Sequence, residues 1–119
     1  MHILFVDDMP DTRDIFRLAF GIQGHTTRVA TNGLEAVEAV KEESFDAIIM
    51  DVEMPEMNGW DAVGHIRQLK NGNQLPIIMF TAYGGDEDYD HAIEVGANCL
   101  MLKPILPQEL LNQIEKLRS

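Results

Sequence analysis

Cysteine is almost absent from this chain, and long apolar segments are missing altogether. Its single cysteine, Cys99, cannot form an internal disulfide, which favours a reducing compartment, and its place in an apolar stretch favours a packing role. Only four apolar residues precede the first pair of aspartates, too few for the core of a signal peptide, and no run is long enough to span a membrane. We therefore expect a cytoplasmic protein without a membrane partner.

Positive charge is also scarce. The 119 residues include 9 lysines and arginines against 20 aspartates and glutamates, which gives a net charge of −11. We do not expect a domain this acidic to contact nucleic acid directly. Part of the excess acid lies in residues 86–90, where the solvated start of a helix is the simpler interpretation and a docking patch for a basic partner is the alternative.

Several common catalytic motifs are missing. The chain has no glycine-rich phosphate loop, no Gly-x-Ser-x-Gly and no Cys-x-x-Cys, so nucleotide-binding, serine hydrolase and thiol redox functions have no basis in the sequence. The histidines lack the spacing of metal ligands, and we expect them at the surface: His2, His25, His65 and His91.

What remains is the composition of an ordinary globular protein, with 45% hydrophobic and 24% charged residues. A chain of this length can bury a sizeable core without disulfides or a structural metal. We expect one domain over residues 1–119, with no linker and no output domain.

Five short runs have the character of strands. Four of them are nearly continuous in apolar residues, as in strands that are buried on both faces: 3–6, 46–50, 76–80 and 100–102. The fifth run, 26–30, places β-branched and polar residues on alternate positions and therefore predicts an edge strand.

A helical pattern follows each strand. We expect helices over 11–23, 32–42, 58–70, 86–95 and 107–117, the first three with Asp11, Asn32 and Asn58 as N-cap residues. In these three helices the spacing of apolar residues predicts that the following positions face the sheet: Ile15, Ala19, Ile22, Leu34, Val37, Val40, Trp60, Val63, Ile66 and Leu69.

Five strand–helix repeats with short loops predict a doubly wound α/β domain of the flavodoxin-like type. Its parallel sheet would have the strand order 2-1-3-4-5, with helices on both faces. In open sheets of this kind, ligands bind outside the carboxyl ends of the strands, where the strand order reverses. That point lies between the first and third strands.

Chemically active side chains follow four of these strands at their carboxyl ends. Because the carboxyl ends of parallel strands meet at one edge of the sheet, we expect these residues to form one site around Asp51: Asp7, Asp8, Asp51, Thr81 and Lys103. A single aspartate or threonine in such a place is usually a turn or cap residue. Their joint occurrence after adjacent strands makes a site the better interpretation.

Three carboxylates at one edge repel one another, by about 3 kcal/mol per pair at a separation of ~5 Å and an effective dielectric constant near 20. A compensating cation is therefore expected, and Mg²⁺ suits a site with few ligands that are all oxygen. We assign Asp8, Asp51 and the backbone carbonyl of Glu53 as its ligands. Asp7 is expected to lie just behind them.

With a cation in place, Asp51 has the chemistry to take up a phosphoryl group, because this transfer needs mostly positioning and charge stabilisation. The ammonium of Lys103 would pair with one phosphoryl oxygen. The hydroxyl of Thr81 and the backbone N–H of Ala82 would donate to others.

With this set of residues the chain resembles a response-regulator receiver domain over essentially its full length. The matching pieces are Asp7-Asp8, Asp51 followed by Met54-Pro55-Glu56-Met57-Asn58-Gly59, Thr81-Ala82, Gly96-Ala97 and Lys103-Pro104. The resemblance implies a two-component or phosphorelay phosphoprotein whose Asp51 receives a phosphoryl group from a sensor histidine kinase or a histidine phosphotransfer protein, with Mg²⁺ required. It also implies that the only chemistry is on the domain itself, including slow dephosphorylation, and that the peptide bond before Pro104 is cis.

The sequence departs from the receiver pattern at two positions. Family members usually have an aromatic switch residue three positions before the lysine, where this chain has Leu100, and a polar cap at the start of the last helix, where it has Leu106. If both leucines lie on the face of the fourth helix, fifth strand and fifth helix, they form part of an apolar surface for a downstream protein or a second copy. The alternative is that both pack under neighbouring side chains.

Two other functions compete with a phosphorylation-dependent switch. Phosphatases that use an aspartyl phosphate usually carry a second aspartate two residues after the nucleophile, where this chain has Glu53, and place the pair on the first strand instead of the third. A receiver-like binding module that works without phosphorylation is the other alternative. The intact acidic residues, Thr81 and Lys103 argue against it, whereas Leu100 keeps it open.

Overall fold

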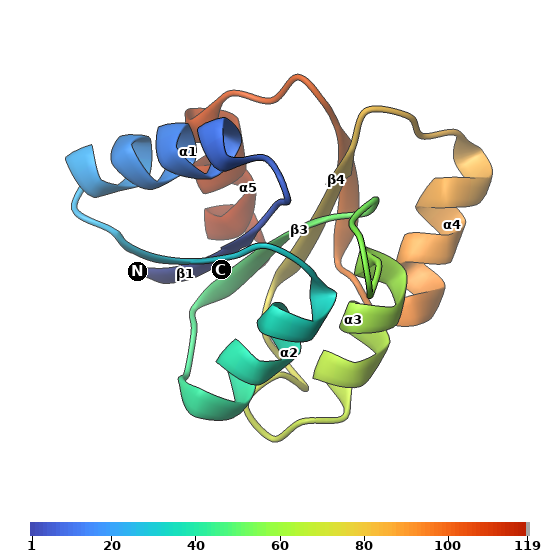
Figure 1. The fold of residues 1–119 in the computed structure, drawn as a ribbon. Coiled ribbons are helices and arrows are strands. Elements are labelled where there is room, and N and C mark those ends of the chain that lie inside the picture. The colour runs from blue at the N-terminus through green and yellow to red at the C-terminus, as the bar shows by residue number, and fades with distance from the viewer. Residues whose placement is uncertain (119) are drawn as a thin grey trace.

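A computed structural model of the chain, described here over residues 1–118, has five strands that alternate with five helices (Figure 1). The elements are β1 His2–Val6, α1 Pro10–Ile22, β2 Thr26–Ala30, α2 Gly33–Glu42, β3 Ala47–Asp51, α3 Gly59–Arg67, β4 Ile77–Thr81, α4 Asp86–Val95, β5 Cys99–Leu102 and α5 Pro107–Arg118. All strand pairs are parallel, in the order β2-β1-β3-β4-β5. The predicted flavodoxin-like fold and strand order are confirmed.

Helices cover both faces of the sheet. In Figure 1, α1 and α5 lie together on one side, and α2, α3 and α4 lie on the other. Within residues 1–118 no helix combines the length and the apolar character that crossing a bilayer requires.

The central strands carry the core because both of their faces are buried. Every residue of β3 and β4 is buried, as the continuous apolar runs predicted. Successive side chains point to opposite faces, so the strands feed two separate cores. One core packs under α2, α3 and α4 and includes Leu4, Ile48, Met50 and Met79. The other packs under α1 and α5 and includes Phe5, Ile49, Phe80 and Leu110.

The prediction of which face α1 turns to the sheet was wrong. Ile15 and Ile22 are 59% and 87% exposed, whereas Phe16 and Phe20 are buried. Phe16 stacks on Phe5 of β1 with ring centroids 4.8 Å apart. Both registers satisfy helical spacing, and the one that buries two aromatic rings removes more apolar surface from water. In α2, Ala36 and Ala39 are buried together with Val40, whereas Leu34, which was also predicted to face the sheet, is exposed.

The N-cap predictions were correct for two of three helices. The side chains of Asn32 and Asn58 accept hydrogen bonds from the backbone N–H groups of Glu35 and Asp61, at 2.9 and 3.0 Å. In α1, however, Met9 is the N-cap and makes no side-chain capping bond. Pro10 occupies the first helical position, where its fixed φ suits a helix start, and this places Asp11 within the first turn.

Gly59, the first residue of α3, sits against the end of β3. Its N–H donates to the carbonyl of Val52 at 2.8 Å, and a methyl group on it would overlap the carbonyl oxygen of Asp51. Glycine is therefore required at this position by close approach, which brings α3 directly under the residue that ends β3.

Replacing Gly59 by alanine is expected to lower the free energy of unfolding by about 1–3 kcal/mol, because the added methyl group must push away the backbone of Asp51. Gly64 is the matched control in the same helix, since a methyl group there meets no atom within 4 Å. Gly64→Ala should stabilise the protein by about 0.5–1 kcal/mol through its better helix propensity. Urea unfolding of both variants tests this, and equal effects would contradict it.

Candidate functional site

Three aspartates meet at the carboxyl edge of the sheet, where β1 and β3 lie side by side. Asp7 and Asp8 directly follow β1, and Asp51 is the last residue of β3. One oxygen from each carboxylate lies within 4.8 Å of the others. Asp7 and Asp51 are buried, and Asp8 is exposed. The structure thus brings together the three carboxylates that the sequence predicted at one edge.

Lys103, which directly follows β5, brings a cation to this cluster at the same edge of the sheet. Its ammonium nitrogen lies 3.4 Å from a carboxylate oxygen of Asp7 and 3.5 Å from one of Asp51. The same nitrogen lies 4.5 Å from the centroid of the Phe80 ring, so the ring covers one side of the ammonium group. The backbone N–H of Lys103 donates to the carbonyl of Thr81 at 2.7 Å, and the Lys103–Pro104 peptide bond is cis.

Asp7 is held in place by backbone and side-chain contacts. One of its carboxylate oxygens accepts a hydrogen bond from the N–H of Met9 at 2.8 Å, and its carbonyl accepts one from the guanidinium of Arg13 at 2.8 Å. Sequence reasoning missed Arg13, because nothing in its spacing connects it to the aspartates. These contacts orient Asp7 toward Lys103 and leave the exposed Asp8 nearest to solvent.

Thr81 ends β4 beside the carboxylates and is buried. Its hydroxyl oxygen accepts a hydrogen bond from the N–H of Tyr83, 3.2 Å away. Ala82, the next residue, is exposed at the mouth of the site. Asp51 pairs with Phe80 in the β3–β4 ladder, so the registers of the two strands bring Thr81 to the same edge as Asp51.

Burial raises the pKa of Asp51 from its ordinary value of 3.8 to about 6. The Lys103 ammonium opposes the shift, while the charges of Asp7 and Asp8 add to it. With all three carboxylates ionised and the Lys103 ammonium included, the cluster carries a net charge of −2. A further cation is the natural complement of this donor set.

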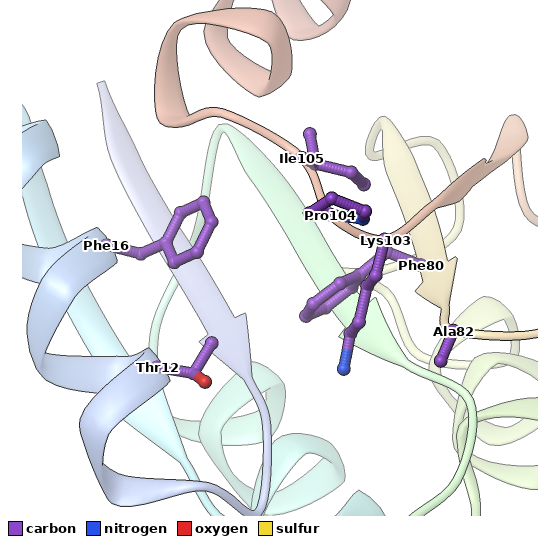
Figure 2. A pocket seen from close by; sticks show the side chains of 7 residues that line it. All are labelled: Thr12, Phe16, Phe80, Ala82, Lys103, Pro104 and Ile105. Atoms are coloured by element: carbon purple, nitrogen blue, oxygen red, sulfur yellow. The ribbon is translucent and has the colours of Figure 1, made fainter.

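Two clefts flank the cluster. The first, of about 420 Å³, lies between α1 and the segment that follows β5, and its lining is mostly apolar. Figure 2 shows Thr12 and Phe16 of α1 on one side of this cleft and Lys103, Pro104 and Ile105 on the other. The second cleft, of about 360 Å³, is lined by Val52, Glu53, Met54, Asn58, Trp60, Thr81, Tyr83 and Asp88.

The comparison with protein families decides the class of the chain. The family model described as "Response regulator receiver domain" matches residues 3–115. The chain belongs to this family. Receiver domains are the phosphoacceptor domains of two-component signalling, and the match sets this chain apart from the phosphatase class considered above.

Individual relatives agree with this. The receiver is 40% identical over 116 residues to an uncharacterized 14.6 kDa protein of Leptolyngbya boryana, with 98% of this chain and 88% of the relative covered. It is 34% identical to the response regulator SaeR of Staphylococcus aureus, covering 98% of this chain but only 50% of SaeR's length.

Solved structures are also similar. The chemotaxis protein CheY4 of Vibrio cholerae has a TM-score of 0.92 and 30% identity, with 98% of this chain and 97% of that chain covered. The receiver domain of the sensor histidine kinase PA1611 of Pseudomonas aeruginosa, which has a magnesium ion coordinated in its active site cleft, has a TM-score of 0.89 and 28% identity, with 99% and 98% covered.

The sequence departs from the family pattern at Leu100 and Leu106, and these two side chains differ in their exposure to solvent. Leu106 is 66% exposed, as expected of a residue in a surface patch. Leu100 is partly buried and packs against the core under α2, α3 and α4, so neither alternative, a shared exposed surface or burial of both leucines, holds for the pair. Leu102, two positions on, points to the same face of β5 as Leu100 but lies at the end of the strand, where it is 54% exposed.

The elevated pKa predicts how the receiver's stability depends on pH without divalent cations. A carboxyl group whose pKa is raised on folding favours the native state below its unfolded value, and this contribution is lost as the pH rises through about 6. The side chain introduced by Asp51→Asn carries no charge, so this variant does not lose stability in that way as the pH rises. The variant should therefore exceed wild type in free energy of unfolding by up to about 3 kcal/mol at pH 7.5, and the gain should vanish near pH 4.

Urea unfolding in EDTA at both pH values measures this difference. Asp90→Asn is the matched control, because it makes the same chemical change at an exposed residue of α4. The explanation fails if the two variants show the same pH dependence, or if Asp51→Asn gains more stability at pH 4 than at pH 7.5.

Proposed function

We propose that this receiver accepts a phosphoryl group on Asp51 from a histidine kinase or a histidine phosphotransfer protein and thereby switches partner binding. The observation that supports the proposal best is the crowding of Asp7, Asp8 and Asp51 within 4.8 Å, with the Lys103 ammonium 3.5 Å from Asp51. An arrangement with one acceptor carboxylate, neighbouring acids and a fixed cation suits phosphoryl transfer and has no evident structural purpose.

The donor set fits Mg²⁺. Asp8 is exposed and Asp51 is buried beside it, so this pair offers carboxylate oxygens while leaving room for water and phosphoryl oxygens. We assign Asp8, Asp51 and the backbone carbonyl of Glu53 as the ligands, with Asp7 behind them. When bound, Mg²⁺ supplies positive charge against the carboxylates and the phosphoryl oxygens.

The protein's own groups account for the transfer. A carboxylate oxygen of Asp51 forms a bond to phosphorus while the donor's P–N bond breaks and its electron pair returns to the imidazole nitrogen. Lys103 holds one phosphoryl oxygen, which requires its ammonium to turn from Asp51 toward the new charge. The hydroxyl of Thr81 and the N–H of Ala82 donate to the remaining oxygens. No other substrate is altered, so the receiver acts as a signalling phosphoacceptor.

The intact mass of the protein after incubation with acetyl phosphate tests this proposal. Wild type should gain one phosphoryl group with Mg²⁺ and none with EDTA, because the crowded carboxylates repel the incoming phosphoryl oxygens unless a cation is present. Asp51→Asn should gain none, while the control Asp90→Asn should behave as wild type. If wild type gains no adduct with either acetyl phosphate or beryllofluoride, the chain is a binding module that works without phosphorylation.

We further propose that the output surface is the face formed by α4, β5 and α5. Exposed apolar side chains lie on α4 and β5 and at the residue directly before α5: Tyr89, Ile93, Leu102 and Leu106. They lie beside the acidic start of α4, whose first turn carries Asp86, Glu87 and Asp88. An apolar surface rimmed by charge suits a downstream protein or a second copy of the receiver.

Light scattering before and after treatment with beryllofluoride and Mg²⁺ tests whether this face joins two copies. We expect the average mass to rise toward that of a dimer on treatment, and Leu106→Ser to abolish the rise by placing a hydroxyl in the apolar contact. Leu18→Ser is the matched control, since Leu18 is equally exposed but lies on α1. A wild type that stays monomeric points to a different protein as the partner.

A further inference from the structure

The aromatic ring of Tyr83 lies next to the site and is exposed to solvent. Its side chain is 78% exposed, and none of the ring contacts found within residues 1–118 involves it. It stands in the loop between β4 and α4, two residues after Thr81. A large apolar group held in water so close to the site is free to change position.

The ring of Tyr83 lies at the wall of the second cleft and can turn into it. Tyr83 lines the cleft together with Trp60, Val52 and Met54, which supply apolar surface. Glu53 and Asp88 line it as well, and their carboxylates are acceptors for a phenolic hydroxyl. If the ring turned into the cleft, its faces would contact apolar side chains and its hydroxyl would donate to a carboxylate.

One hydrogen bond ties the loop of Tyr83 to the site. The hydroxyl oxygen of Thr81 accepts the N–H of Tyr83 at 3.2 Å. If that hydroxyl turns to a phosphoryl group on Asp51, the N–H of Tyr83 loses its acceptor. Gly84 and Gly85 follow: a Cβ atom on Gly84 would meet the side chain of Leu102, whereas one on Gly85, the N-cap of α4, would meet no atom within 4 Å. Two successive glycines let the backbone after Tyr83 adopt conformations that other residues rarely reach.

The cleft also contacts α4. Trp60, the only tryptophan of the chain, packs edge-on against His91 of α4 with ring centroids 4.6 Å apart. Asp88, in the first turn of the same helix, is part of the cleft wall. Any group that enters the cleft changes the surroundings of both Trp60 and the start of α4.

We propose that Tyr83 is the moving aromatic residue of this receiver. When Asp51 is phosphorylated and Thr81 turns to the phosphoryl group, the ring of Tyr83 closes into the cleft against Trp60 and shifts the start of α4. Leu100 stays in the core, where it is packed already. This inference rests on the proposed function, because it requires a phosphoryl group on Asp51.

Fluorescence of Trp60 tests the inference. The protein is kept in Mg²⁺ throughout, and emission is recorded before and after addition of beryllofluoride, with acetyl phosphate and intact mass in parallel. Closure excludes water from the indole, so the emission maximum should move to shorter wavelength. Tyr83→Phe should keep this shift because it keeps the ring, whereas Tyr83→Ala should lose it while still gaining the phosphoryl mass.

The chain provides matched controls. Tyr89 is the other tyrosine, is also exposed and does not line the cleft, so Tyr89→Ala should keep the full shift. Acrylamide quenching of Trp60 in wild type is an independent measurement, and its quenching constant should fall on phosphorylation.

The outcomes separate this inference from the function on which it rests. A shift that persists in Tyr83→Ala, or a wild type that gains the phosphoryl mass with unchanged emission and quenching, overturns the role of Tyr83 and leaves the proposed function intact. A wild type that gains no phosphoryl mass overturns both.

Discussion

The confinement of three carboxylates beside a single ammonium group is the constraint on which the rest of the structure depends. Like charges at this distance repel by several kilocalories per mole unless a cation or a proton intervenes. Lys103 contributes one positive charge against three carboxylates, so the ionised cluster keeps a net negative charge. Such an arrangement costs folding free energy, and the surrounding structure must hold it in place.

The sheet supplies that support. Buried strands β1, β3 and β4 pack between two apolar cores, so their carboxyl ends cannot move apart without opening both. Gly59 holds the start of α3 against the backbone of Asp51, and the ring of Phe80 holds Lys103 from below. The acidic cluster thus lies at the ends of strands that are packed between both cores, whereas Ala82 and Tyr83 lie in the loop that follows β4.

The surroundings of the cluster are asymmetric. On one side an apolar cleft adjoins Lys103, and on the other a more polar cleft adjoins Thr81 and reaches Trp60 next to α4. A change of charge at Asp51 therefore acts on a mostly apolar cleft on one side and on a more polar cleft on the other. On the side toward α4, Thr81 accepts a hydrogen bond from Tyr83, Tyr83 and Trp60 line the same cleft, and Trp60 packs against His91.

The amino-acid sequence by itself determined the fold and the membership of the acidic site. Short apolar runs that alternate with helical patterns favour buried strands, and parallel strands deliver Asp7, Asp8, Asp51, Thr81 and Lys103 to a common edge. Tertiary structure alone decided which face of α1 is buried, that Leu102 is exposed instead of Leu100, and that Arg13 and Tyr83 contact site residues. Helical periodicity allows more than one register, and the choice depends on how much surface each register buries against neighbours that are distant in the chain. An apolar residue at the end of a strand is covered only where a distant segment packs over it.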